Sequence, residues 1–282
     1  MSQALTIARH RLPHSAAPAW ESFGDALRAE WTKMRTMPGT AWILAGICAL
    51  TVAVSAGTDA ATKCTIGGAC AADTTRLTLT GIEVGQALVA VLAVLAITGE
   101  YSTGMIRTTF AAMPRRSVVL AAKASVLTCL VLPAAVVAVA GSLAAGWLIL
   151  PGNGFTAVRG FALVSLAHGP TVRAAVGSVL YLALIGLLSL AIATMVRDSA
   201  VATGSVLGLL YVAPIASLLL AGQPVWQRRV QRYAPVNSGL TIEDTTGLRH
   251  LPIGPWGGLG VLAIWAAASL LTAALALRLR DA

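Results

Sequence analysis

Six long apolar runs constrain the fold of this chain more than any other feature of its sequence. A helix needs about 20 mainly apolar residues to cross the hydrocarbon core of a bilayer. The runs lack the alternation of polar and apolar residues that is typical of barrel strands, so each must satisfy its backbone hydrogen bonds as a helix. We therefore expect an all-α membrane protein with six transmembrane helices, centred near Ile47, Val89, Pro133, Ala183, Leu209 and Ala267.

The composition and the spacing of the runs refine this expectation. Hydrophobic residues make up 57% of the chain and charged residues only 11%. Pro133 interrupts the longest run and is expected to bend its helix. Only Arg197-Asp198-Ser199 separates the fourth run from the fifth, which predicts a tight hairpin. The predicted spans cover residues 40–56, 81–98, 118–150, 174–196, 200–221 and 256–277.

The basic residues predict an orientation rather than a nucleic-acid surface. The chain carries a net charge of +9, but its lysines and arginines are scattered over the loops and form no single stripe. With the N-terminus inside, twelve of the twenty basic residues face the cytoplasm, as the positive-inside rule requires. Both termini are then cytoplasmic, and residues 223–255, which include four arginines, form the largest outward segment.

Residues 1–37 divide into a leader and an amphipathic helix. Apolar side chains recur in the helix at a spacing of three or four residues, while charged residues occupy its other faces. Such a helix either lies in the lipid headgroup region or packs into a groove of a partner protein, and amphipathicity alone does not decide between them. The apolar side chains are Trp20, Phe23, Leu27, Trp31 and Met34.

The cytoplasmic loop at residues 99–117, between the second and third runs, is the most informative polar segment. Ile106, Phe110 and Met113 lie at helical spacing, and Pro114 ends the pattern. Two interpretations remain open for this loop. It is either an ordinary loop whose basic residues fix the orientation of the chain, or a short amphipathic helix that receives force from a cytosolic motor protein.

Three polar or reactive residues lie toward the outer side. Glu83 is near the outer end of the second span, where its carboxylate either reaches water or contacts a cationic substrate. Cys64 and Cys70 flank five residues of the first outward loop. An oxidising compartment makes a small disulfide ring chemically possible there, with a free thiol pair as the alternative.

The sequence argues against catalysis by this chain alone. A phosphate-binding loop needs Gly-Lys-Ser or Gly-Lys-Thr, and none of the three lysines, at positions 33, 63 and 123, follows a glycine. The chain has no His-Glu-x-x-His zinc motif, and none of its membrane serines has a histidine aligned with it. We therefore expect no bound metal, no cofactor and no enzymatic activity from this chain on its own.

Three regions of the sequence carry a family resemblance. The first is Arg28-Ala29-Glu30-Trp31-Thr32-Lys33-Met34-Arg35-Thr36, and the second is residues 99–109 with Pro114-Arg115-Arg116. The third is looser and comprises residues 195–200, 233–237, Trp256 and 278–282. Together they resemble the permease subunits of ABC-2-type ABC transporters, in the alanine-rich form found in actinobacteria.

The resemblance implies an architecture and a set of partners. Residues 38–282 would form a six-span transmembrane domain of the type V exporter kind, preceded by an amphipathic interface helix. Such permeases lie in the bacterial plasma membrane and pair as dimers, so a second permease chain is expected, most simply a second copy. They recruit two separate ATP-binding subunits, which would hold the ATP and Mg²⁺ that this chain lacks motifs for.

The resemblance also implies roles for individual residues. The interface helix would use Trp20, Phe23, Leu27, Glu30, Trp31 and Met34. The element that couples to the ATPase would use Glu100, Tyr101, Thr103, Arg107, Phe110, Pro114, Arg115 and Arg116. Residues 223–255 would correspond to the outer re-entrant helices of the family.

The sequence as a whole favours the membrane subunit of an ATP-driven exporter. Its apolar spans, with few fixed charges, suit an amphiphilic small molecule or peptide such as an antibiotic, and we expect the first, second and fifth spans to line the path. One alternative is an ATP-independent secondary carrier, which would place several ionisable residues at bilayer depth. Another is a sensing or immunity subunit of an ABC complex that moves no cargo.

Overall fold

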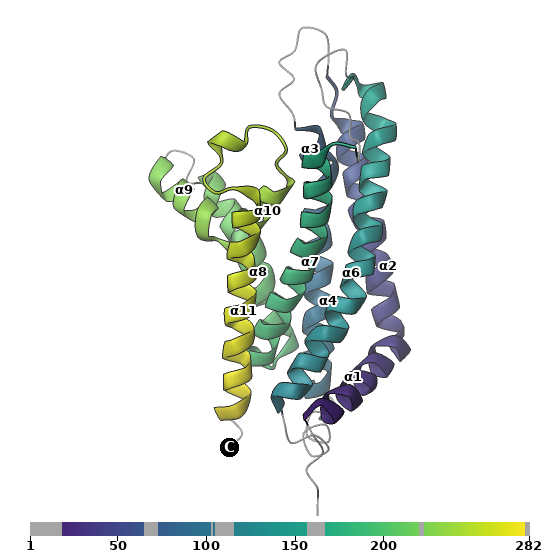
Figure 1. Cartoon of the computed structure of the whole chain (residues 1–282), viewed down its shortest axis with the longest axis vertical. Coiled ribbons are helices and arrows are strands. Elements are labelled where there is room, and N and C mark those ends of the chain that lie inside the picture. Colours follow the sequence, from purple (N-terminus) through teal and green to yellow (C-terminus); the bar gives the residue numbers. More distant parts are fainter. Residues whose placement is uncertain are drawn as a thin grey trace, which may run out of the picture.

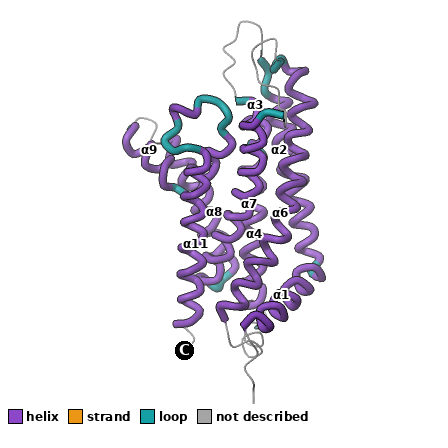
Figure 2. Tube along the Cα trace, viewed as in Figure 1, coloured by secondary structure: helices purple, strands orange, loops and turns teal. Residues whose placement is uncertain are grey.

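The computed structural model describes residues 19–64, 73–102, 104, 116–156, 167–219 and 223–279, and every element in these ranges is a helix. Figures 1 and 2 show a bundle of long helices with short helices at its two ends. The elements are α1 (Ala19–Thr36), α2 (Pro38–Ala61), α3 (Thr74–Leu79), α4 (Ile82–Ser102), α6 (Arg116–Ile149), η1 (Leu150–Asn153), α7 (Gly169–Val196), α8 (Ser199–Leu219), α9 (Pro224–Tyr233), α10 (Pro235–Leu240), η3 (Thr241–Glu243), η4 (Leu248–His250) and α11 (Pro255–Leu279).

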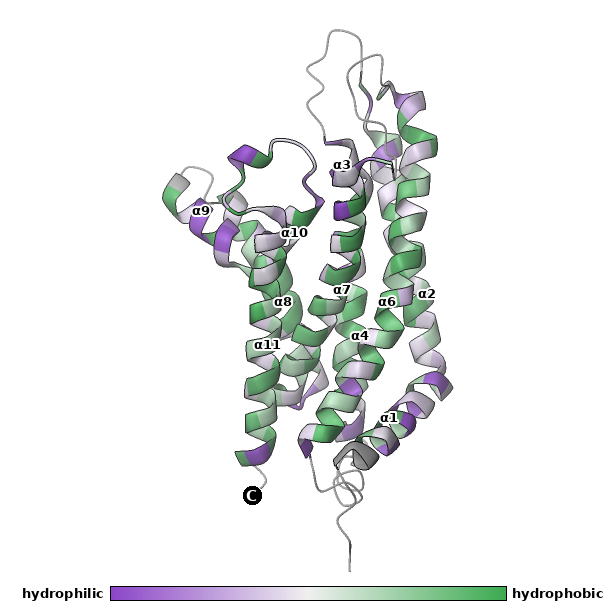
Figure 3. Ribbon diagram, in the orientation of Figure 1, coloured by the Kyte–Doolittle hydropathy of each residue, from purple (hydrophilic) through white to green (hydrophobic). Residues whose placement is uncertain are grey.

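The six predicted spans are confirmed as helices long and apolar enough to cross a membrane. Hydropathy is highest along the middle of the bundle and lowest at its ends (Figure 3). The longest span is α6, whose 34 residues correspond to about 51 Å at 1.5 Å per residue, and Pro133 lies inside it. The spans are Pro38–Ala61, Thr74–Tyr101, Arg116–Asn153, Gly169–Val196, Ser199–Ser217 and Pro255–Leu279.

Helix α7 forms the centre of the bundle. It packs against α4, α6, α8 and α11. In the apolar 18-residue stretch of α7, 61% of the residues are buried. The corresponding share of buried residues is only 17% for the α8 span and 22% for the α2 and α11 spans. Those three helices therefore present most of their apolar surface to the outside of the chain, where lipid or another subunit can cover it.

Gly81 with Gly85 and Gly204 with Gly208 have the four-residue spacing that is typical of close helix packing, and the two pairs behave differently from each other. A Cβ atom at Gly81 would lie 2.0 Å from the Thr51 carbonyl oxygen, and one at Gly85 would lie 2.3 Å from the Thr51 Oγ1. Only glycine permits this close approach of α4 to α2, so a small-residue contact is confirmed there. At Gly204 and Gly208 of α8, an added Cβ would meet nothing within 4 Å.

The predicted hairpin between the fourth and fifth spans is confirmed. α7 ends at Val196 and α8 begins at Ser199. Arg197 takes a left-handed conformation with φ 65°, and the Asp198 carboxylate accepts a hydrogen bond from the Val201 backbone nitrogen at 2.8 Å. The residue that caps the end of α7, Arg197, is therefore followed directly by the residue that caps the start of α8, Asp198.

The bundle has two ends with different contents. The α1 end holds α1 and the last turns of α4 and α11, and the α10 end holds α3, α10 and η3 (Figure 1). The outward segment predicted at residues 223–255 does contain short helices, and it lies at the α10 end. The side of the membrane that each end faces stays a prediction.

Candidate functional site

A buried network of four charges joins three helices at the α1 end. The Lys123 Nζ of α6 donates to the Glu30 Oε2 of α1 at 2.6 Å and to the Glu100 Oε1 of α4 at 2.7 Å. It also donates to the Ala96 carbonyl oxygen at 3.1 Å, and Lys33 donates to the same Glu100 oxygen. We call Glu30, Lys33, Glu100 and Lys123 the α1-end network.

The network is deeply buried and electrically balanced. Glu30, Glu100 and Lys123 are each at most 5% exposed, whereas the Lys33 side chain is 22% exposed. Burying a charge without a partner costs several kcal/mol, and the cost falls when the ions pair and hydrogen-bond well. Two carboxylates and two ammonium groups balance their charges across α1, α4 and α6, although the Glu100 Oε2 is buried with no hydrogen-bond partner among the described residues. Removing one member would leave a buried charge unpaired.

Further contacts extend the same junction to the remaining spans. The Arg116 Nη1, at the start of α6, donates to the Leu277 carbonyl oxygen of α11 at 3.2 Å. The Arg197 guanidinium, in the turn between α7 and α8, lies over the Tyr101 ring of α4 at 5.5 Å from its centroid. The last turn of α4 and the first turns of α6, which flank residues 103–115, are therefore attached to α1, α11 and the α7–α8 turn.

The interface helix that the sequence predicted lies along the α1 end and packs mainly against α6. Its inward face carries Ala26, Glu30 and Met34, all buried, with Phe23 and Leu27 half-buried beside them. Trp31 is 39% exposed and lies on the other side, available to lipid or to a partner. The side chain of Trp20 lies outside the described residues.

The structure describes only part of the predicted coupling segment. Glu100 and Tyr101 belong to the last turn of α4, and Arg116 begins α6. The Glu100 carboxylate points into the bundle, so within this chain it fixes α4 to α1 and α6. Thr103, Arg107, Phe110, Pro114 and Arg115 lie outside the described residues, and docking of an ATPase there stays a prediction.

A second polar cluster fastens the η3 segment to α3 and α7 at the α10 end. Asp73 caps α3 by accepting from the Thr75 and Arg76 backbone nitrogens, both at 3.2 Å. The same carboxylate accepts from the Thr245 hydroxyl at 2.6 Å and from the Thr246 backbone nitrogen at 2.8 Å. Burial opposes ionisation of Asp73, but these hydrogen bonds outweigh it and leave its pKa below the ordinary value.

Asp244 supplies the charged part of this cluster. The Arg76 Nη1 pairs with the Asp244 Oδ1 at 2.5 Å, and Arg173 of α7 donates to the Asp244 carbonyl oxygen. Burial raises the pKa of Asp244 above its ordinary value, although Arg76 acts in the opposite direction. We call Asp73, Arg76, Arg173, Glu243 and Asp244 the α10-end cluster.

Glu243 is the most unusual carboxyl group in this cluster. It is 3% exposed, and its Oε1 accepts from the Ser178 hydroxyl of α7 at 3.1 Å. Burial raises the pKa of Glu243 to about 8, against the lowering effect of the Ser178 hydrogen bond. Its carboxyl group is therefore mostly protonated at neutral pH.

Glycines allow the same segment to insert between α7 and α11. A Cβ at Gly177 of α7 would lie 1.9 Å from the Ile242 Cγ1, and one at Gly258 of α11 would lie 2.0 Å from the Ser238 carbonyl oxygen. A Cβ at Gly239 would lie 2.7 Å from the Tyr181 ring. Close backbone approach, rather than a loose surface loop, therefore positions α10 and η3.

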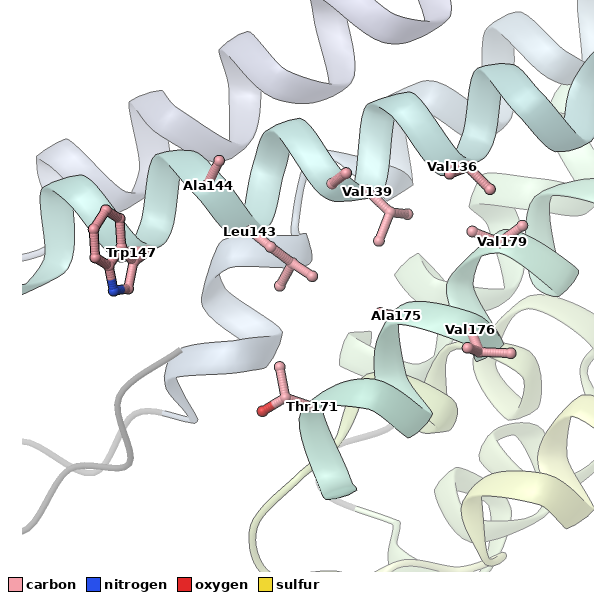
Figure 4. A pocket seen from close by; sticks show the side chains of 10 residues that line it. Val136, Val139, Leu143, Ala144, Trp147, Thr171, Ala175, Val176 and Val179 are labelled. Carbon is pink, nitrogen blue, oxygen red and sulfur yellow. The ribbon is translucent and has the colours of Figure 1, made fainter. Parts of the chain in front are cut away.

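An apolar groove of about 480 Å³ lies between α6 and α7. Figure 4 shows its side chains projecting from the two helices toward a shared space, with Thr171 the polar member of the lining. The groove belongs to the third and fourth spans, whereas we predicted that the path follows the first, second and fifth. It is lined by Val136, Val139, Ala140, Leu143, Ala144, Trp147, Thr171, Ala175, Val176 and Val179.

The remaining predicted positions are located as follows. Glu83 is exposed in the first turn of α4, and its carbonyl oxygen accepts from the Tyr211 hydroxyl at 2.7 Å. Cys64 is disulfide-bonded, but Cys70 lies outside the described residues, so the predicted pairing stays a prediction. In the described ranges, His, Cys, Asp and Glu form no group of three or more that could hold a metal ion.

Sequence reasoning missed the pairing of the lysines and the role of the Asp73 to Asp244 region. The predicted orientation treats Lys123 simply as one of the cytoplasmic basic residues. Lys123 is, however, the eighth residue of the apolar helix α6. A lysine at that depth requires a nearby acid, and this was the available signal. The contacts of Asp73 reach residues more than 170 positions away along the chain, and no local pattern announces such a pairing.

Comparisons with known proteins add no assignment. The chain matches no family model, and it matches no curated protein sequence.

Proposed function

We propose that this chain is the membrane-spanning subunit of an ATP-driven exporter of the ABC-2 type, working with separate ATP-binding subunits and a second permease chain. The proposal starts from the three sequence regions that resemble this family. It takes the α1 end as cytoplasmic, because most of the basic residues outside the spans belong to that end or to the loops leading from it.

The α1-end network is the observation that carries the proposal. Residues 103–115 connect the last turn of α4 with the start of α6. Glu100 in that last turn and Lys123 in the second turn of α6 both bind α1. A force applied to the loop by a motor protein would displace α1, α4 and α6 together, because separating them would expose buried charges. Such a junction suits the conversion of nucleotide-driven movement into rearrangement of the spans.

The distribution of charge favours an amphiphilic cargo over an inorganic ion. The buried ionisable groups gather at the two ends of the bundle, while the middle of the spans is apolar (Figure 3). The groove between α6 and α7 is likewise lined almost entirely by aliphatic side chains. A secondary carrier coupled to ions would need ionisable groups around a site near the midplane.

The proposal is tested by purifying the chain with the proteins that bind it, reconstituting the sample in lipid nanodiscs, and measuring ATP turnover. We expect Arg107→Ala in the loop to lower turnover at least about tenfold, whereas Arg249→Ala at the α10 end leaves it unchanged. Equal turnover in both variants would exclude the loop as the coupling element. A chain that forms no complex with any ATPase would favour the secondary carrier.

Transport and sensing are separated by a second measurement. Proteoliposomes that contain the complex should accumulate a fluorescent amphiphilic antibiotic in an ATP-dependent manner if the complex is an exporter. ATP turnover that responds to the antibiotic without any accumulation would instead identify a sensing or immunity subunit.

A further inference from the structure

We infer that α9 is a binding surface for the headgroups of anionic phospholipids at the α10 end of the bundle. This inference does not depend on the proposed transport function, because it concerns only how the chain is held in its membrane. It rests on the faces of α9, on where the helix is anchored, and on its charge.

The two sides of α9 differ in exposure and in chemistry. Gln227, Val230 and Gln231 are half-buried, and they share the side that packs toward α8 and α10. The opposite side is exposed and carries all the charge of the helix together with apolar and aromatic side chains. Its members are Val225, Trp226, Arg228, Arg229, Arg232 and Tyr233.

Aromatic rings and arginines are interleaved on this exposed side. The Arg229 guanidinium lies over the Trp226 ring at 5.1 Å from its centroid, and that of Arg232 lies over the Tyr233 ring at 5.7 Å. Trp226 is 55% exposed and Tyr233 is 60% exposed. Tryptophan and tyrosine prefer the boundary between hydrocarbon and headgroups, where one part of the side chain is apolar and another is wet.

The position of α9 in the fold matches that boundary. The helix follows the fifth span directly and precedes α10, so it begins where a membrane-spanning helix has just ended. Its last turn is anchored to the sixth span, because the Trp265 Nε1 of α11 donates to the Tyr233 carbonyl oxygen at 3.1 Å. In Figure 1 it projects sideways from the bundle, away from α6 and α7.

The charge of α9 defines the partner. Its ten residues include three arginines and no acid, so the exposed side carries a charge of +3. An amphipathic helix with basic residues on one face and aromatic residues beside them binds the surface of anionic bilayers. Arginine also matches phosphate oxygens with paired N–H donors. Anionic lipid headgroups carry negatively charged phosphate esters at this level of the membrane, and these can pair with the three arginines.

This surface also explains an exception in the sequence. The arginines of residues 223–255 depart from the positive-inside pattern, which alone would place them with the other bases. Three of these four arginines belong to α9, where they lie in the plane of the headgroups rather than in a freely solvated loop. There they act as an anchor for this end of the bundle.

The inference is tested with a photoactivatable headgroup analogue of phosphatidylglycerol and the matching analogue of phosphatidylcholine. Full-length protein is reconstituted in nanodiscs that contain either probe, and labelling of residues 223–234 is measured by mass spectrometry. We expect phosphatidylglycerol to label this segment preferentially in the wild type. In the triple variant Arg228→Gln, Arg229→Gln, Arg232→Gln, the preference should fall at least about tenfold, since each basic residue near an anionic surface contributes roughly fivefold.

Two further variants keep the test decisive. The triple variant to Lys keeps the charge and should retain most of the preference, which also shows whether loss in the Gln variant follows from misfolding. A control with Arg28→Gln, Arg35→Gln and Lys63→Gln removes the same charge from exposed positions elsewhere and should leave α9 labelling unchanged. Equal labelling by the two probes in the wild type, or an unchanged preference in the Gln variant, would overturn the inference.

Discussion

The α1-end network and the α10-end cluster solve the same problem in two ways. Both bring ionisable side chains of several helices into buried positions at an end of the bundle. At the α1 end, two carboxylates face two ammonium groups, so charge is balanced by charge. At the α10 end, Asp73 depends mainly on hydrogen bonds, and the Glu243 carboxyl group accepts a hydrogen bond from the neutral Ser178 hydroxyl.

The two ends therefore differ in the changes that would destabilise them. A balanced ion network fails when one member is removed, because the others stay buried and unpaired. A carboxyl group held by a neutral donor tolerates substitution by an amide but responds to pH. The first end is thus sensitive to substitution, and the second to pH.

The largest effect is expected for Lys123→Met at the α1 end. Removing the ammonium group leaves Glu30 buried without the lysine that pairs with it, and leaves Glu100 with Lys33. Losing one partner of a buried ion pair costs about 3–5 kcal/mol. Thermal and denaturant unfolding of the detergent-solubilised protein should show this loss. Lys63→Met, at an exposed lysine, is the matched control, and the comparison of the two ends fails if both variants are equally stable.

A smaller effect is expected for Asp73→Ala at the α10 end. The substitution removes the cap of α3 and the acceptor for Thr245 and Thr246, which together should cost about 2–3 kcal/mol. Asp25→Ala, at an exposed acid of α1, should change stability by less than about 0.5 kcal/mol. Hydrogen exchange should localise the loss to α3 and residues 241–250. A uniform loss of protection across all spans would contradict a local clamp.

The smallest effect, and the one that distinguishes the two ends most sharply, is the pH dependence caused by Glu243. Burial raises the pKa of Glu243 in the folded state to about 8, so the folded chain holds a proton that the unfolded chain releases near pH 4.5. Stability should therefore fall as the pH rises, by about 1.4 kcal/mol between pH 6 and pH 7.

Substitution separates this slope from other titrations. Glu243→Gln should remove the slope between pH 6 and pH 7 while keeping the hydrogen bond from Ser178. Asp25→Asn, at an exposed carboxylate of α1, should leave the slope unchanged. An identical slope in the wild type and in Glu243→Gln would show that Glu243 does not hold a proton in the folded chain.

Much of the fold could be predicted because its main determinants are local. Six apolar runs and the Arg197-Asp198-Ser199 turn define the spans and the hairpin without reference to distant residues. The close approach at Gly81 and Gly85 also followed from their spacing. The amphipathic pattern located α1, but it gave no reason to place Glu30 on the buried face, because the acid becomes acceptable there only beside Lys123.

The candidate sites were predicted less well because they depend on contacts between distant segments. Lys33 and Glu100 are 67 positions apart, and Arg76 and Asp244 are 168 apart. The apolar groove depends on how α6 and α7 diverge, which hydropathy does not encode. A single charged residue in an apolar helix indicates that a partner exists, because leaving it unpaired would cost free energy. It does not indicate which distant residue that partner is.

The sequence separations within the two ends also order the events of biosynthesis. A ribosome releases Glu30 and Glu100 before Lys123, so both acids already exist when the lysine of the third span enters the membrane. Asp73 and Arg76 must instead wait until residues 244–246 have been made. The α1-end network can therefore close once the third span has been made, whereas the α10-end cluster becomes complete only after the fifth.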